Sequence, residues 1–234
     1  MPSKTILESA NRFLTLRRAK EFGLSAGQIG YDATAIRERK RRLIAEFAGY
    51  RRSQLEDGKF EFVRAHASFL SPHEVRLVTP DGKETQVRFR FGLISTGSEL
   101  NVLEIPGLAE TAFLHSDLAL ESDIVPPSVV ILGGGAVALE FATFYSSLGS
   151  KVTVIQRSSQ FLKEADADVS GALTEALRQH GVEMICDTKL LRVAAEKGEK
   201  AVYFLRSLHV TACMMMESDP QTESFRLGDH FFYC

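Results

Sequence analysis

The sequence of 234 residues is long enough for one large domain or two modest ones, and its 44% hydrophobic content can supply a substantial core. The formal net charge is only -2, so the overall balance argues against a nucleic-acid or anionic-membrane partner. No apolar run approaches the roughly 18 residues of a membrane-spanning helix, and the first residues lack the order of a signal peptide. We therefore expect a cytoplasmic protein.

Helical periodicity dominates the first part of the chain. Apolar residues recur at helical spacing over about residues 6–14 and 36–50, on either side of a glycine-containing break. Asp32 or Thr34 could cap the second helix. That helix carries a basic run at residues 37–42. A run of this kind can serve as a nuclear signal or contact phosphates. Because its charges fall mostly off the apolar stripe, we expect a solvated helix face instead.

Between about residues 60 and 94 the apolar period changes to two, which is typical of strands. Two alternating runs flank a turn at residues 80–82. The alternating residues are Val75, Leu77, Thr79, Val87, Phe89 and Phe91. We expect an antiparallel hairpin with one solvent-facing side.

A glycine-rich turn follows the most apolar run of the chain. In residues 128–132 four apolar residues follow Ser128 without a break, as in a strand that is covered on both faces. Residues 133–138 then satisfy the pattern G-x-G-x-x-G/A. Gly133 permits a tight turn, and Gly135 lets the backbone approach a pyrophosphate.

A helix that is apolar nearly all round, and therefore buried, is predicted over about residues 136–148. Gly149 ends it, and residues 151–155 form a second strand. The start of the helix, at Ala136 and Val137, offers unpaired N–H groups and a partial positive charge to phosphates. This strand–turn–helix–strand predicts a dinucleotide-binding site of the Rossmann type, and a Rossmann-like turn without a ligand is the alternative.

The end of the second strand is the position that usually reads the adenosine ribose. An acidic residue there binds the 2′-hydroxyl and repels a 2′-phosphate. Gln156 carries no charge, and the following Arg157 can form a bidentate pair with a phosphate. We therefore expect NADPH to be preferred over NADH, and an ordinary surface arginine remains the alternative.

One more strand and helix complete the regular pattern. Asp166 or Asp168 can cap a helix, and a third strand over residues 182–186 then implies a parallel sheet. Beyond about residue 206 the periodicity is lost, and we expect a poorly ordered tail. The three cysteines and six histidines are too dispersed for a metal site, and Cys186 is expected to be a small buried side chain.

With these motifs placed, the chain resembles the pyridine nucleotide–disulfide oxidoreductases, and within them the dihydrolipoamide dehydrogenase and mercuric reductase members, up to about residue 205. Residues 1–5 resemble the family's segment after its second redox cysteine, and residues 64–69 resemble its turn along the flavin adenine. Residues 95–98 are similar to its A-T-G-S motif beside the flavin dinucleotide, with serine in place of the first alanine. Residues 133–140 match its nicotinamide site.

The resemblance implies an α/β fold of the FAD/NAD(P)-binding, Rossmann-like, two-dinucleotide type. A partial flavin domain with a helical pair and a hairpin would cover about residues 1–115, and a nicotinamide domain about 116–205, with 206–234 as an unassigned tail. The implied activity is that of an oxidoreductase in which a flavin accepts hydride from the nicotinamide and passes electrons to a cysteine pair. The implied cofactors are FAD, held by a partial site, and NADPH.

The resemblance also implies roles for particular residues. Lys4 and Glu140 match a lysine and a glutamate that pair beside the flavin ring, where they tune the flavin and gate the nicotinamide. A capping lysine and an ordinary helix glutamate are the alternative interpretation. The positions implied to contact the flavin are His66, Ala67, Thr96 and Gly97.

The chain departs from the family pattern in several ways. The flavin's own glycine motif and both redox cysteines should precede residue 1. Neither the second flavin strand nor the interface domain, through which the family forms homodimers, is found after about residue 205. We expect an inactive fragment of a FAD-dependent NAD(P)H oxidoreductase. Two alternatives stay open: a non-catalytic NADPH-binding module or pseudoenzyme that scaffolds through the helix over about 32–52, and a truncated or frame-shifted product.

Overall fold

The structure, a computed structural model, describes the chain in five stretches: residues 2–101, 104–196, 199–206, 222–227 and 231–233. Two compact units result, Met1–Ile44 with Glu104–Cys234 and Ala45–Leu103. None of the helices in the described stretches is long and apolar enough to cross a membrane. The domain boundaries near residues 115 and 205 stay a prediction.

The first unit is built on a sheet of five strands in the order β4-β11-β5-β6-β7. Every neighbouring pair in this sheet is parallel, as the alternation of strand and helix predicts. In sheet order the strands are β4 (Leu114–His115), β11 (Phe231–Tyr233), β5 (Ser128–Leu132), β6 (Lys151–Ile155) and β7 (Glu183–Ile185).

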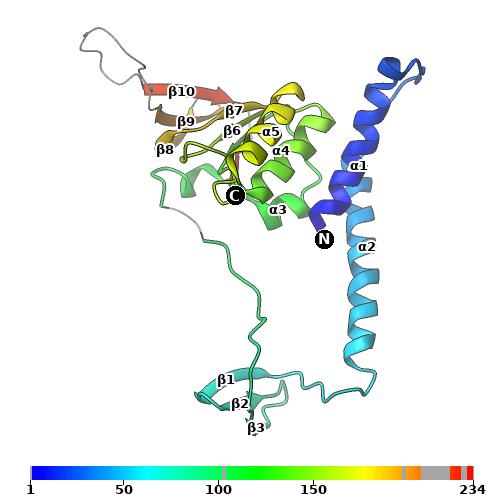
Figure 1. Cartoon of the computed structure of the whole chain (residues 1–234), viewed down its shortest axis with the longest axis vertical. Helices are drawn as coiled ribbons and strands as arrows, with labels where there is room; N and C mark the ends of the chain where they lie inside the picture. The colour runs from blue at the N-terminus through cyan, green and yellow to red at the C-terminus, as the bar shows by residue number, and fades with distance from the viewer. Residues whose placement is uncertain (1, 102–103, 197–198, 207–221, 228–230, 234) are drawn as a thin grey trace. The chain divides into compact units, whose positions relative to one another are not determined.

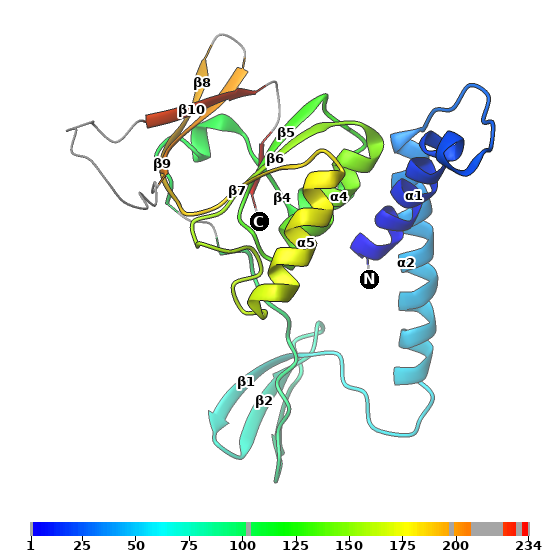
Figure 2. The same ribbon diagram turned by 45° about the horizontal axis from the view of Figure 1, so that its top comes forward.

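Both faces of this sheet are covered. The helices α4 and α5 lie on one face, and an antiparallel sheet in the order β10-β9-β8 lies toward the other (Figures 1 and 2). The helices that lie wholly within this unit are α1 (Pro2–Arg17), α3 (Ser116–Glu121), α4 (Ala136–Leu148) and α5 (Ala167–Gln179), with short 3-10 turns η1 (Ala19–Phe22) and η2 (Ala109–Thr111). The antiparallel strands are β8 (Thr188–Glu196), β9 (Glu199–Arg206) and β10 (Thr222–Leu227).

The covering of both faces explains the unbroken apolar run of β5. Val129 and Ile131 pack into a cluster with α4, whereas Val130, Leu132 and the β9 residue Phe204 belong to a second cluster. Because successive side chains of a strand point to opposite faces, a strand with two buried faces needs apolar residues at every position. The predicted strand–turn–helix–strand is therefore confirmed.

Two segments of the tail correct the expectation of no regular structure. β10 pairs with β9 in antiparallel register, and β11 lies between β4 and β5 with parallel pairing to both. The expectation was wrong for these segments because their strands are defined by partners that precede them in the chain, and local periodicity does not encode such pairing. Cys213 and Cys234 lie outside the described residues.

The helix α2 (Ala33–Leu55) begins where the sequence predicts. The carboxylate of Asp32 accepts a hydrogen bond from the Ala35 N–H at 3.1 Å, so Asp32 caps the helix. Thr34 instead donates its hydroxyl to the Asp123 carboxylate at 3.4 Å. The capping interaction is local in sequence, which is why it could be predicted.

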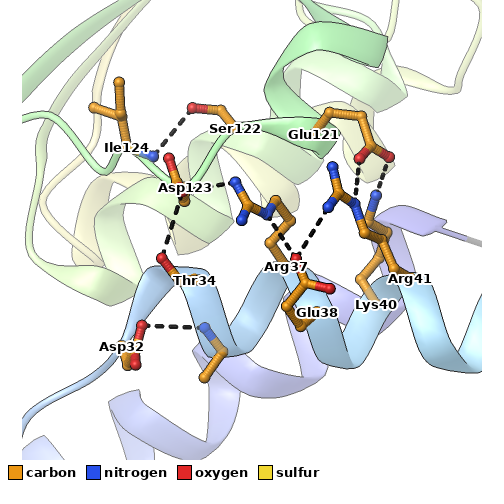
Figure 3. A network of polar contacts seen from close by, with 11 residues as sticks. Asp32, Thr34, Arg37, Glu38, Lys40, Arg41, Glu121, Ser122, Asp123 and Ile124 are labelled. Carbon is orange, nitrogen blue, oxygen red and sulfur yellow. Dashed lines mark hydrogen bonds and ion pairs between the residues drawn. The ribbon is translucent and has the colours of Figure 1, made fainter.

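The basic run of α2 is only in part the solvated face that its charge pattern indicates, since Glu38, Arg41 and Arg42 are exposed but Lys40 is not (Figure 3). Lys40 is only 3% exposed and forms an ion pair with Glu121 at the end of α3, to which Arg41 also donates at 2.8 Å. Arg37 donates to Asp123 at 2.6 Å. The prediction was wrong for Lys40 because the acidic partners come from a distant part of the sequence, and only the folded chain brings them to the helix.

The second unit contains three antiparallel strands in the order β1-β2-β3, namely β1 (His66–Ser71), β2 (Glu74–Val78) and β3 (Glu84–Arg88). The predicted hairpin is confirmed as β2–β3, and β1 adds a third strand. The expectation that only one side of the hairpin faces solvent is wrong, since all of β3 is exposed and Phe69 on β1 is 58% exposed. The reason is that no second layer packs on these strands in the described part of the unit.

Candidate functional site

The glycine-rich turn joins the end of β5 to the start of α4. Gly133 adopts a positive φ of 121°, and its N–H donates to the Ile155 carbonyl at 2.9 Å, which closes the turn against β6. Gly135 is the N-cap of α4, and the first helical bond runs from the Leu139 N–H to the Gly135 carbonyl at 3.1 Å. The N–H groups of the first turn, including that of Ala136, therefore have no partner within the helix.

The backbone at this helix start is open to its surroundings. A Cβ added to Gly135 would meet no atom within 4 Å, so the backbone is open to a ligand there. The adjacent Val137 is 46% exposed. This corrects the expectation that α4 is buried all round. Its first helical turn lies beside the glycine-rich turn and is exposed, and the buried residues of the helix begin at Ala138. An open, positively polarised helix N-terminus suits the phosphates of a dinucleotide.

The end of β6 brings the predicted ribose reader to the same turn. The Gln156 N–H donates to the Ile185 carbonyl at 2.8 Å, and the Gln156 carbonyl accepts from the Thr188 hydroxyl at 3.0 Å. These bonds hold the Gln156 backbone in place. Its side chain lies against Gly134, where an added Cβ would be 2.9 Å from Gln156 Cδ. Arg157, the next residue, is exposed.

Lys4 and Glu140 come together in an ion pair, as the resemblance implies. Lys4 lies in the first turn of α1 with a side chain that is 65% exposed, and Glu140 lies in the second turn of α4 with a side chain that is 23% exposed. The packing of α1 on α4, which buries Ile6 and Ala10 completely or nearly so, positions the pair. Whether the pair acts on a flavin stays a prediction.

The environment keeps Glu140 ionised. Partial burial raises the pKa of the Glu140 carboxyl, but hydrogen bonds from Lys4 and Ser3 and the positive charge of Lys4 outweigh burial. The pKa of Glu140 is therefore below its ordinary value. The carboxylate stays charged at neutral pH and can hold Lys4 in place.

The residues that are implied to contact a flavin all lie in the second unit. His66 and Ala67 begin β1 and are exposed, and Thr96 and Gly97 are exposed in the segment after β3. Gly97 has a φ of +87°, which suits a turn and which L side chains rarely adopt. Their role toward a flavin stays a prediction.

Sequence reasoning missed two residues at this site. Phe161 is 2% exposed, and its ring approaches the middle glycine of the turn, Gly134. The signal for Gly134 was present, since the turn carries a third glycine that the fingerprint does not require. No local signal marks Phe161, because its contact with the turn depends on the path of the chain after β6.

Comparison with known proteins places the chain among flavin-dependent reductases. A family model described as "Pyridine nucleotide-disulphide oxidoreductase" matches residues 1–216. The chain is 31% identical over 195 residues to a dihydrolipoyl dehydrogenase of Bacillus subtilis, which covers 82% of this chain and 42% of that protein. It is 29% identical over 204 residues to a mercuric reductase of Bacillus cereus, with 87% of this chain and 32% of that protein covered.

The fold comparison agrees. The HOCl-induced flavoprotein disulfide reductase RclA from Escherichia coli has a TM-score of 0.70 and 23% sequence identity, and the match covers 99% of this chain and 45% of that one. A likeness at this level of identity shows the fold alone, an FAD/NAD(P)-binding Rossmann-like arrangement. The chain spans less than half the length of these relatives.

Proposed function

The chain belongs to the pyridine nucleotide-disulphide oxidoreductase family, whose members use FAD and a nicotinamide dinucleotide, and from this premise we propose that the turn between β5 and α4 binds NADPH. The observation that carries the proposal is the combination of an open helix start at Gly135 with Gln156 lying on the same turn. The phosphates and the ribose of one dinucleotide would thus both contact residues of the first unit.

The choice of NADPH rests on the end of β6. Gln156 has no charge to repel a 2′-phosphate, and the exposed Arg157 guanidinium can make a bidentate, charge-assisted contact with it. The experiment is a titration of the purified chain with NADPH and with NADH at the same ionic strength. We expect tighter binding of NADPH, and equal dissociation constants would contradict the proposal.

The reaction class follows from the family. A bound flavin would supply the acceptor for hydride from the nicotinamide. The contribution of this chain would be to orient the nicotinamide nucleotide on α4 and to present the Lys4–Glu140 pair beside the reacting rings. An ionised Glu140 would keep the ammonium of Lys4 at a set position there.

These 234 residues contain one G-x-G sequence and no closely spaced cysteine pair. We therefore propose that the chain does not itself reduce a disulfide. A second candidate, a non-catalytic NADPH-binding module, is favoured by the confinement of the predicted nicotinamide contacts to the first unit and of the predicted flavin contacts to the second. Binding of NADPH without turnover is expected of both candidates, and turnover by the chain would exclude the module.

A further inference from the structure

A short segment after β6 is fastened across the glycine-rich turn. The Leu162 N–H donates to the Gly134 carbonyl at 2.8 Å, and the Phe161 carbonyl accepts from the Ser170 hydroxyl of α5 at 2.6 Å. Leu162 has a φ of +47°, a left-handed conformation that L side chains rarely adopt. We call residues 158–162 the strap, because its hydrogen bonds join the turn to α5.

The strap leaves no room for a side chain at Gly134. A Cβ added there would lie 2.7 Å from Phe161 Cδ1, and 2.9 Å and 3.0 Å from Gln156 Cδ and Cγ. Contacts of this length are shorter than carbon atoms tolerate. The dinucleotide fingerprint leaves this middle position free, so the requirement for glycine here comes from the strap and from Gln156.

We propose that Gly134 and Phe161 are positioning residues for nucleotide specificity: together they hold the Gln156 side chain over the turn, where its amide donates to the 2′-phosphate of the bound nucleotide. The inference rests on the proposed NADPH site and adds two residues to it. Phe161 supplies a buried wall, and the bare Gly134 supplies the space that Gln156 occupies. Arg157 then binds the same phosphate from an exposed position.

The two neighbours of Gly134 differ in how easily they move. Phe161 is 2% exposed and its carbonyl is bonded to Ser170, so its ring is held in place. Gln156 is half-buried, and no described residue hydrogen-bonds to its side-chain amide. A methyl group at Gly134 would therefore displace the Gln156 side chain first.

The test compares three glycine-to-alanine variants of the whole chain by titration with NADPH and NADH. Gly134→Ala should lower the affinity for NADPH relative to NADH by about threefold to tenfold, the size of one hydrogen bond. Gly135→Ala fills the space for the pyrophosphate, which both nucleotides share, and should weaken both equally. Gly171→Ala, on the exposed side of α5 with no atom within 4 Å of its added Cβ, should change neither.

The outcomes separate this inference from the proposed function. Failure of the unaltered chain to bind either nucleotide would overturn the proposed function and this inference with it. The unaltered chain could instead bind NADPH, while Gly134→Ala keeps the same NADPH-to-NADH affinity ratio or loses affinity equally for both nucleotides. That result would overturn this inference alone. If Gly134→Ala does not fold, Phe161→Leu serves as the second variant, because it removes the aromatic ring that packs against Gly134. We expect it to lower the affinity for NADPH relative to NADH. An unchanged relative affinity in folded Phe161→Leu would overturn the inference.

Discussion

Arg157 is the residue on which we expect the preference between the two nicotinamide nucleotides to depend most directly. Replacing it in Arg157→Glu should invert the preference, because a carboxylate accepts from the 2′-hydroxyl of NADH and repels the phosphate of NADPH. A charge-assisted contact of this kind contributes roughly 1.5–3 kcal/mol, so NADPH affinity should fall at least about tenfold. The measurement is a pair of equilibrium titrations.

Lys151 offers a matched control for this variant. It is exposed at the opposite end of the same strand, β6. Lys151→Glu makes the same change of charge and should leave the NADPH-to-NADH ratio unaltered. An equal shift in both variants would mean that long-range charge, and not the guanidinium at position 157, determines the preference.

The Lys4–Glu140 pair is expected to contribute little to stability. Lys4 is largely exposed, and exposed ion pairs stabilise proteins by at most about 1 kcal/mol. Because the folded-state pKa of Glu140 is below its ordinary 4.5, the contribution is full above that pH and is lost as the pH falls through the folded pKa. The difference in unfolding free energy between the unaltered chain and Lys4→Met should therefore decrease as the pH falls through the folded-state pKa of Glu140.

Urea unfolding at pH 7 and at pH 3 measures this difference. Lys20→Met removes another exposed lysine, from η1, and serves as the control that should show no such pH dependence. A loss above about 3 kcal/mol in Lys4→Met at pH 7 would contradict the assignment of an exposed pair and indicate a buried one.

At the scale of the element, α2 is attached to the first unit through charges. Hydrogen bonds from Lys40 and Arg41 lower the pKa of Glu121, so the carboxylate is ionised and compensates the buried ammonium. Glu121→Gln would leave Lys40 buried without its counter-charge and should destabilise the chain by about 1–3 kcal/mol. Lys40→Met keeps a long side chain without charge and should be close to neutral.

The double variant Lys40→Met/Glu121→Gln sharpens this prediction. Once the buried charge is gone, Glu121→Gln should cost much less than it does alone, and a double-mutant cycle of urea unfolding midpoints measures the difference. Strictly additive effects would contradict a direct pair and would restore the solvated-face interpretation of the basic run.

At the scale of the whole molecule, the chain should bind NADPH without sustaining catalysis. Flavin affinity in this type of fold depends on a pyrophosphate at a glycine-rich helix start. These residues hold a single G-x-G, which we propose binds the nicotinamide nucleotide. Reduction of a substrate disulfide in this family uses a cysteine pair that itself alternates between dithiol and disulfide, and such a pair needs Cα atoms no more than about 7 Å apart. Cys186 directly follows β7, and the three cysteines at positions 186, 213 and 234 do not form the closely spaced motif from which the family's redox pair would be predicted.

The assay records the visible spectrum after incubation with FAD and gel filtration, and then follows NADPH consumption with disulfide and metal-ion acceptors. A full-length mercuric reductase treated in parallel is the positive control. We expect no retained flavin and no turnover. A stoichiometrically yellow chain with sustained NADPH consumption would contradict this prediction and would show that these residues complete a flavin site.

The sequence by itself determined the features that depend on neighbouring residues. The β5–turn–α4–β6 unit, the Asp32 cap and the helix end at Gly149 were predictable, because strand burial, glycine backbone angles and capping bonds act within a few residues. The pairing of Lys4 with Glu140 was predictable as well, although only through the family resemblance.

Only the tertiary structure decided the features that need partners from distant parts of the chain. Lys40 is buried because Glu121 comes to it from α3, and β11 is a strand because β4 and β5 lie on either side of it. The glycine at position 134 is required because the strap returns across the turn. In each case the feature is stabilised by a contact between segments that are distant in the sequence. A local pattern of apolar and charged residues does not indicate which distant segment will make that contact.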